Sequence, residues 1–366
     1  MRTCERLHIS KEIVIGTNTY LIGSQKPYIL VDTAEGLESY IPILTSALQG
    51  STATTNPSAP DVSDIIISHW HRDHIGGLPS VLSLLKNLWI GRDHGSQAEY
   101  QGPKLHKYPT AGEQHHGAHN VLSAIEEMLH KELYTAAPDG SIFHDLYDGQ
   151  AFSDQGTPLL EVIHTPGHTV DSICLYLPLD RALYTADTVL GHGTAVFEDL
   201  AAYIASLNKI LEYNNNRSTS ASISLVSSLS SPSLGEVDVV SQYDILYPGH
   251  GDILTNGPET IATYIKHRLE REAQIVEALR LPVPVELLQS EEAQDVRDGS
   301  QRWTIWNLVR NIYKSYPENL WLPATRSVHL HLKKLEGEGF VRYVGGEGED
   351  MTWELVTISS KFDDQI

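Results

Sequence analysis

One short segment limits the fold and the chemistry of this chain more than any other. Residues 64–68 read Asp-Ile-Ile-Ile-Ser, a β-branched run that predicts a buried strand. The run continues into His69-Trp-His71-Arg-Asp73-His74, and a Gly-Gly pair then leads to an apolar stretch that predicts a helix. Four side chains of metal-binding type therefore fall on one strand-to-helix turn.

The order of these residues favours a metal site. Imidazole nitrogens and carboxylate oxygens suit zinc or another first-row divalent cation. His69 and His71 can reach one cation, while Asp73 and His74 can reach a neighbouring position. The alternative is a polar loop that is rich in histidine by chance, since the chain contains 18 His. The His-x-His-x-Asp-His order is far more specific than a single His-x-His pair, so we prefer the metal site.

Three later segments follow the same pattern, in which an apolar run ends in a ligand-type residue. In layered α/β folds, ligands gather at the carboxyl ends of strands. The segments are 159–163 followed by His164-Thr-Pro-Gly-His168, 182–185 followed by Ala-Asp187, and 244–247 followed by Pro-Gly-His250. A strand Tyr28-Ile-Leu-Val ends in the same way at Asp32.

Taken together, these motifs resemble the metallo-β-lactamase superfamily, from Gly16 to about Arg268. The resemblance implies an α/β fold, the αβ/βα sandwich, around two divalent metal ions for which zinc is the first expectation. Carried over position by position, it implies one metal on His69, His71 and His168, a second on Asp73, His74 and His250, and a bridge by Asp187. Asp73 would also be catalytic, because it can orient the attacking water.

The sequence indicates the roles of several further residues less specifically. Asp32 either orients a metal ligand or simply begins a turn. His192 and Tyr247 are candidates for substrate contact, ligand support or proton donation, whereas His164 lies outside the family pattern. The histidines of segment 101–139 are expected at the surface near an entrance: His106, His115, His116 and His119.

The chain of 366 residues is long enough for a core domain and an appendage. The sequence Leu281-Pro-Val-Pro284 interrupts a helical pattern, which predicts a hydrolase domain over 1–281 and a second domain over 285–366. Polar insertions near 50–60 and 214–242 are expected to be surface loops. Helices over 303–316 and 320–335 and a hairpin over 341–356 predict a winged-helix-like C-terminal domain.

Segments 190–200, 267–272 and 320–339 resemble one subgroup of the superfamily. That subgroup contains fungal thioesterases, which release polyketides from the acyl carrier domain of a non-reducing synthase, and lactamase-like endoribonucleases. Both have the same metal ligands, so composition has to separate them. The chain has 26 Lys and Arg against 47 Asp and Glu, a net charge of -21, which disfavours binding to RNA phosphates but leaves a local basic groove open.

We therefore expect a dinuclear hydrolase that acts on a carrier-bound polyketide or a small thioester in secondary metabolite biosynthesis. The alternatives are a metal-dependent endoribonuclease of single-stranded RNA and a non-catalytic binding protein on the same fold. No apolar run approaches about 20 residues and no signal peptide opens the sequence. An intracellular, cytoplasmic protein without a membrane partner is expected.

Overall fold

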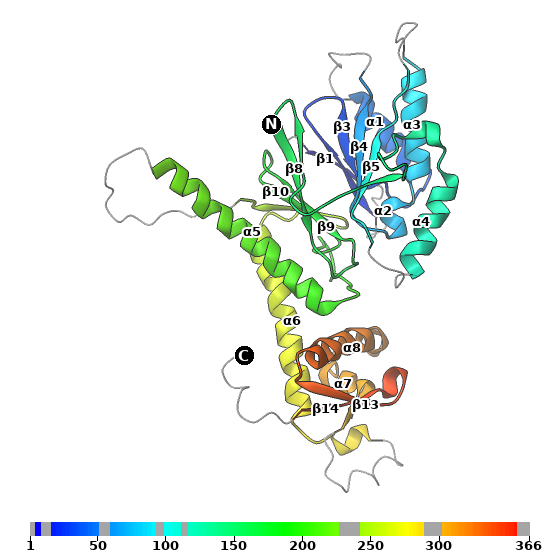
Figure 1. Ribbon diagram of the computed structural model, residues 1–366. Coiled ribbons are helices and arrows are strands. Elements are labelled where there is room, and N and C mark those ends of the chain that lie inside the picture. Colours follow the sequence, from blue (N-terminus) through cyan, green and yellow to red (C-terminus); the bar gives the residue numbers. More distant parts are fainter. Residues whose placement is uncertain are drawn as a thin grey trace. The chain divides into compact units, whose positions relative to one another are not determined.

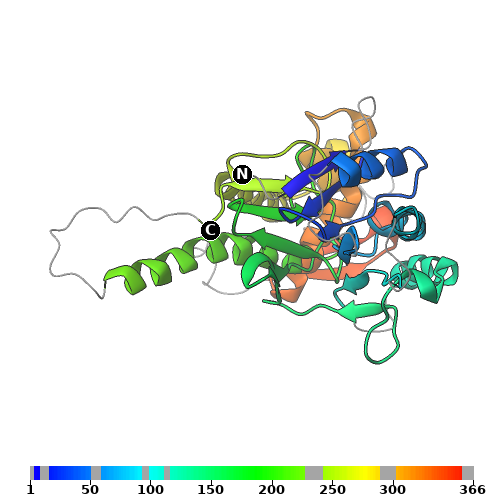
Figure 2. The ribbon, with the colours of Figure 1, turned by 90° about the horizontal axis from the view of Figure 1, so that it is seen from above.

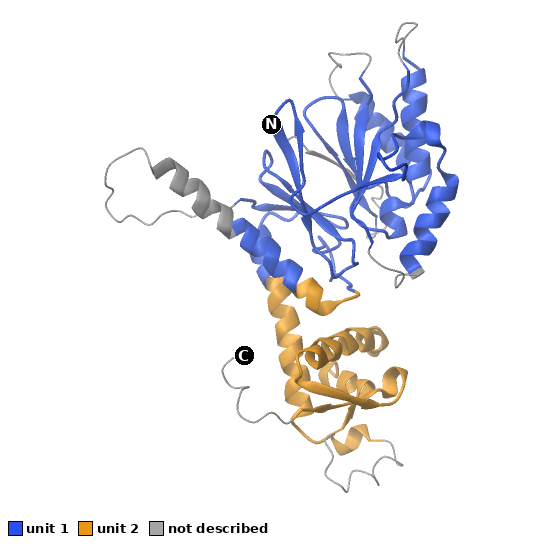
Figure 3. Ribbon diagram, in the orientation of Figure 1, with its two compact units in different colours: residues 1–197, 205–262 blue, residues 198–204, 263–366 orange. Residues whose placement is uncertain are grey.

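The structure is a computed structural model that describes residues 4–8, 16–50, 59–92, 99–110, 116–226, 242–288 and 302–356. The chain divides into two compact units (Figure 3). Unit 1 contains residues 1–197 and 205–262, and unit 2 contains residues 198–204 and 263–366.

The first sheet of unit 1 has six strands in the order β1-β2-β3-β4-β5-β6. The first three strands pair antiparallel, and β3 to β6 pair parallel. The strands are β1 (Cys4–His8), β2 (Asn18–Ile22), β3 (Tyr28–Val31), β4 (Val62–Ile67), β5 (Lys104–Lys107) and β6 (Phe143–Asp145).

The second sheet has five strands in the order β11-β10-β9-β8-β7. Its strands pair antiparallel except for β10 and β11, which are parallel. The strands are β7 (Ala151–Asp154), β8 (Thr157–His164), β9 (Ile173–Leu177), β10 (Ala182–Ala186) and β11 (Ile245–Pro248).

Strand β4 shows why these strands are apolar along their whole length. Ile65 and Ile67 are buried in the core on one face of the first sheet, and Ile66 is buried in the core between the two sheets. Successive strand residues point to opposite faces, so a strand covered on both sides needs an unbroken apolar run. Such a strand delivers the residues that follow it to a sheet edge at a fixed position.

Helices cover the outer face of the first sheet (Figures 1 and 2). They are α1 (Tyr40–Gly50), α2 (Arg72–Ile75), α3 (Leu78–Ile90) and α4 (His116–Met128). Leu44, Leu82 and Ile125, from three of these helices, are buried in the same core as Ile65.

Helix α5 (Leu200–Val226) contacts the second sheet through its unit 1 residues, where the ring centroids of Tyr213 and Tyr176 lie 5.4 Å apart. The helix–sheet–sheet–helix layering confirms the predicted αβ/βα sandwich. The loop predicted from residue 214 is wrong as far as residue 226, because this stretch contains no Gly or Pro and continues the helix. Residues 227–241 of this insertion, and most of the insertion near 50–60, lie outside the described residues.

Unit 2 is built on the C-terminal part of α6 (Gly257–Leu279) and a three-stranded sheet in the order β12-β14-β13. Its other elements are β12 (Trp303–Thr304), α7 (Ile305–Ile312), α8 (Trp321–Gly337), β13 (Val341–Gly345) and β14 (Thr352–Leu355). The two helices and the hairpin confirm the winged-helix prediction. Helix α7 is shorter than expected because Trp303 pairs with Trp353 in the sheet and the Thr304 side chain caps the helix. Within the described part of the chain, no helix combines the length and the apolar character that a membrane crossing requires.

The expectation for His106 is wrong. Its side chain is buried on β5, and its Nε2 lies 2.8 Å from Asp64 Oδ1 on the neighbouring strand β4. His119 is exposed as expected, His115 lies outside the described residues, and the side chain of His116 is not among those described. Strand pairing with β4 could not be foreseen from the polar sequence of β5.

A buried ion pair connects the two sheets. Lys107, at the end of β5, places its Nζ 2.7 Å from Asp171 Oδ2 in the loop before β9, and the two side chains are 5% and 0% exposed. Thr169 Oγ1 donates a hydrogen bond to the other oxygen of Asp171. A charge pair at this depth needs both partners, because either charge alone would remain desolvated.

Replacing Lys107 with Met should therefore lower the free energy of unfolding by about 3 to 5 kcal/mol. Arg181→Met is the matched control, since the Arg181–Asp244 pair is about half exposed and is expected to contribute less than about 1 kcal/mol. Urea unfolding of both variants, followed by circular dichroism, measures the difference. Equal losses in the two variants would contradict the structural role of the buried pair.

Candidate metal centre

The seven residues expected to bind metal come together at one end of the two sheets. His69 and His71 follow β4, and Asp73 and His74 lie in α2. The other three come from the second sheet: His168 from the loop after β8, Asp187 directly after β10, and His250 after β11. All seven therefore follow the carboxyl ends of strands, as the sequence pattern predicted.

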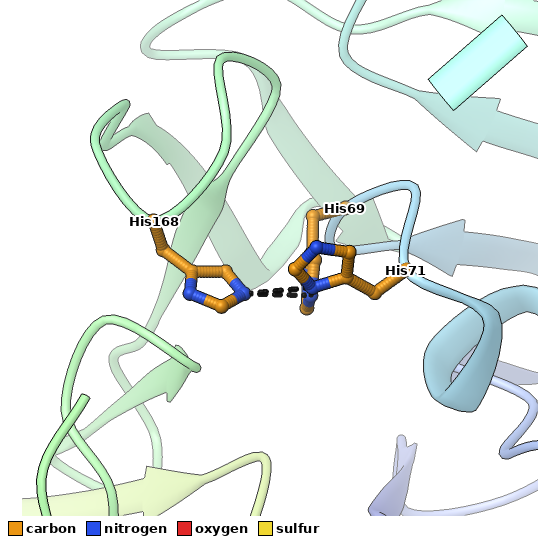
Figure 4. A group of neighbouring side chains, drawn as sticks. All are labelled: His69, His71 and His168. Atoms are coloured by element: carbon orange, nitrogen blue, oxygen red, sulfur yellow. Dashed lines mark hydrogen bonds between the residues drawn. The ribbon is translucent and has the colours of Figure 1, made fainter. Parts of the chain in front are cut away.

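Three histidines form the first group. His69, His71 and His168 point toward one another (Figure 4). His168 Nε2 lies 2.9 Å from His71 Nδ1 and 3.2 Å from His69 Nε2, and His69 Nε2 lies 3.0 Å from His71 Nδ1. One cation can contact all three atoms.

A second group contains Asp73, His74 and His250. His250 Nε2 lies 3.1 Å from Asp73 Oδ2 and 3.4 Å from His74 Nε2. Asp187 lies between the groups: its Oδ2 is 3.6 Å from His168 Nε2 and 3.3 Å from His250 Nε2. Asp187 is thus in the position that a bridging ligand would occupy.

Two histidines of the first group, His69 and His71, favour the neutral form. Burial, together with the nearby rings of His74 and His168, lowers the pKa of His69 well below its usual value. Burial and the His168 ring lower the pKa of His71 to about 4. Neutral imidazole is the form that coordinates a cation.

The second group is held by opposite charges. Burial alone would raise the pKa of Asp73, but the hydrogen bond from His250 and the charge of His74 lower it to about 2. Burial likewise opposes protonation of His250, yet its hydrogen bonds to Asp187 and Asp73 raise its pKa to about 9. The carboxylates therefore favour a positive charge at this position, which protons or a metal ion can supply.

The donor atoms fit divalent cations. His168 Nδ1 donates to the Val196 carbonyl at 2.7 Å. The Ser68 hydroxyl donates to Asp32, so Ser68 Oγ accepts from His69 Nδ1 at 3.0 Å, and both rings present the lone pair of Nε2 to the group. Two lone pairs 3.2 Å apart repel unless a cation lies between them. Asp187 Oδ1 is also buried without a hydrogen-bond partner among the described residues. A metal ion would satisfy both requirements.

Asp32 orients the second group. Its carboxylate is fully buried and accepts hydrogen bonds from His74 Nδ1 at 2.7 Å, from Ser68 N and Oγ at 2.8 Å each, and from the Tyr184 hydroxyl. These contacts favour the orienting role over that of a simple turn residue. The sequence did not identify Ser68 or Tyr184, because neither belongs to a ligand pattern.

Gly249 lets the His250 loop approach the other ligands. A Cβ atom at this position would lie 2.5 Å from Asp187 Oδ1 and 2.9 Å from the His74 ring. Any side chain would displace one of them. The Pro-Gly-His order quoted from the sequence therefore has a direct steric reason.

The other candidates lie outside the two groups. His192 is exposed on the loop after Asp187. Tyr247 is buried in the core between the sheets and stacks on Tyr20 with ring centroids 5.4 Å apart. His164 donates from Nε2 to the Val170 carbonyl at 2.9 Å and stacks on Tyr108, in agreement with its expected absence from the metal site.

Comparisons with known proteins agree with this geometry. The model of the metallo-beta-lactamase superfamily matches residues 13–250. The chain belongs to this superfamily. The model of the beta-lactamase associated winged helix domain matches residues 304–353, within unit 2. The two His and Asp groups are typical of the dinuclear sites of metallo-beta-lactamase-fold metal hydrolases.

The proteins that are similar to this chain do not all have the same name. The "Beta-lactamase-like protein 2 homolog" of Drosophila melanogaster is 32% identical to this chain. The similarity covers 89% of this chain and 84% of the relative. The "Atrochrysone carboxyl ACP thioesterase" of Aspergillus chevalieri is 28% identical, with 70% of its length and 83% of this chain covered. A metallo-beta-lactamase family protein of Thermus thermophilus shares the fold, with a TM-score of 0.56, 17% identity, and coverage of 97% of this chain and 99% of the other.

Replacing Asp32 with Asn tests the orienting role. The amide keeps the shape of the side chain but removes the negative charge and one acceptor, which weakens the hydrogen bond that orients the His74 ring. We expect the affinity for divalent metal to fall about 10- to 100-fold. Zinc titration against a chromophoric chelator measures this change, and Asp244→Asn, in a half-exposed ion pair, is the control. Unchanged affinity in the Asp32 variant would contradict the assigned role.

Proposed function

We propose that this chain is a dinuclear metal-dependent thioesterase that releases an acyl group, a polyketide in the first instance, from an acyl carrier domain. The observation that carries the proposal is the set of three overlapping three-residue groups, one of which joins Asp187 to His69 and His74 from the other two. Similarity to a fungal carrier-protein thioesterase over 83% of the chain supports the thioester as substrate.

The ligand roles are part of the proposal. One ion would be held by His69, His71 and His168, and the other by Asp73, His74 and His250. Asp187 would contact both ions. Bound there, two divalent ions, with zinc the first candidate, would supply a water of lowered pKa and a Lewis acid for the carbonyl oxygen. A non-catalytic binding protein would not need the complete donor set.

Asp73 is the residue that we assign to the attacking water. Its side chain is 40% exposed, so it faces the opening of the site, and its depressed pKa keeps it ionised at neutral pH. An ionised carboxylate can orient the water toward the carbonyl carbon, and the lowered pKa of that water would let it lose its proton to solvent as the C–O bond forms. The C–S bond then breaks and the sulfur leaves with the electron pair.

The supply of proton donors favours a thioester over RNA. A thiol has a pKa near 8.5, so its thiolate leaves without a strong acid, whereas the alkoxide of a phosphodiester needs a donor. Tyr247 is buried in the core and His192 is exposed on a loop, so we assign neither as a proton donor. Hydrolysis of a thioester therefore suits this site better, because its leaving group does not need a proton donor.

The charges of unit 2 also disfavour RNA. Arg302 and Arg342 pair with Glu354, and Lys333 pairs with Glu336. Lys334 pairs with both Glu272 and Glu338. Cations that already have carboxylate partners attract phosphate weakly, so these four side chains are poor candidates for contacts to nucleic acid.

His71→Ala and Asp187→Ala should each reduce thioester hydrolysis more than about 100-fold. Loss of a metal ligand should cost more activity than loss of a residue that only orients a ligand, which typically costs about 10- to 100-fold. Both should also reduce the metal bound per chain. His119→Ala, at an exposed helical histidine, is the control.

The assay offers the zinc-loaded protein an acyl-carrier thioester and a single-stranded RNA in parallel, and it measures free thiol and RNA length. Release of thiol alone supports the proposal. RNA cleavage without thioester turnover would replace it by an endoribonuclease, and inactivity toward both would favour a binding protein. Full activity of the Asp187 variant without metal would reject the metal mechanism.

A further inference from the structure

We infer that Asn18 is a positioning residue for His250, and that it selectively controls occupancy of the second metal position. The inference rests on the proposed ligand role of His250. Asn18 begins β2 in the first sheet, whereas His250 follows β11 at the edge of the second sheet. The two residues are far apart in the sequence, yet the side chain of one holds the loop of the other.

The Asn18 amide spans the His250 loop. Its Nδ2 donates to the Pro248 carbonyl at 3.0 Å and to the Gly251 carbonyl at 2.9 Å, which lie on either side of the Gly249-His250 pair. Two acceptors for one nitrogen also fix the orientation of the amide, because the reversed group would put its oxygen against two carbonyl oxygens. Asn18 is fully buried, so water does not compete for these bonds.

Neighbouring groups of the same segment complete the contact. The Asn18 backbone N–H donates to the Gly249 carbonyl at 2.7 Å, and the Tyr20 hydroxyl donates to the Pro248 carbonyl at 2.9 Å. His250 Nδ1 lies 3.2 Å from the Gly16 carbonyl, so the ring presents Nε2 to Asp73 and Asp187. The start of β2 thus fixes both the loop and the ring that it carries.

Backbone groups hold the other side of the loop. Gly249 N donates to the Ala186 carbonyl, and Gly191 N donates to the His250 carbonyl, each at 2.8 Å. These bonds persist whatever side chain stands at position 18, so they keep the loop near the second sheet. Loss of the Asn18 amide would instead remove a hydrogen bond from two loop carbonyls at once on the side of β2, and the Tyr20 hydroxyl would still donate to one of them.

The effect should be selective because the first group has separate support. His69 is held by Ser68 and His168 by the Val196 carbonyl, and neither contact involves β2. Loosening His250 should therefore weaken one metal position and spare the three-histidine group. A general loss of stability would weaken both.

Zinc titration of Asn18→Ala against a chromophoric chelator tests this inference. Removal of a supporting partner typically costs 10- to 100-fold in metal affinity, so we expect one zinc ion to bind about 10- to 100-fold more weakly and the other with unchanged affinity. Thr19→Val is the matched control: it removes the buried hydrogen bond between the Thr19 and Tyr40 hydroxyls from the next residue of β2. It should bind two ions as the unaltered protein does.

Tyr20→Phe is the second variant, for use if Asn18→Ala does not fold as judged by circular dichroism. It removes the hydroxyl that reaches Pro248 and retains the ring, so the same ion should bind more weakly but with a smaller change. Unchanged second-site affinity in the folded variants, or equal weakening of both sites, would overturn the inference. Fewer than two ions on the unaltered protein would instead reject the ligand assignment of the proposed function.

Discussion

The buried carboxylate of Asp32 is the interaction on which the arrangement of unit 1 depends. An ionised carboxylate is costly to bury unless hydrogen bonds compensate its lost hydration. Asp32 obtains them from Ser68 after β4, from His74 in α2 and from Tyr184 on β10. Because Tyr184 belongs to the second sheet and the others to the first, one side chain links both sheets and orients a metal-site histidine.

The same kind of support recurs around the site. Two of the groups that hold the ligand loops, Ser68 and Asn18, are buried at the end or the start of a strand, whereas the Val196 carbonyl belongs to the exposed loop after β10. Rigid strands therefore fix the ligand geometry, and the exposed residues at the rim, such as Asp73, remain open to a substrate. This separation explains how one metal-binding framework can serve different substrates in one superfamily.

Much of the fold was predictable because its strands are buried on both faces. An unbroken apolar run such as that of β4 identifies a central strand without knowledge of its neighbours. Polar strands gave no such signal: β5 reads Lys-Leu-His-Lys, and the burial of His106 and Lys107 depends on partners in other segments. The helix over residues 214–226 was missed for a related reason, since its Ser and Asn residues do not form an apolar pattern.

By itself, the sequence determined the ligand types and their positions after strands, because His-x-His-x-Asp-His and Pro-Gly-His are local patterns. Only the tertiary structure decided which of these residues meet, which nitrogen of each ring faces the group, and which groups hold them there. Ser68 and Tyr184 hold Asp32, and Asn18 holds the His250 loop, through contacts between segments that are distant in the chain. Such contacts depend on the packing of two sheets against each other, and no spacing along one strand encodes them.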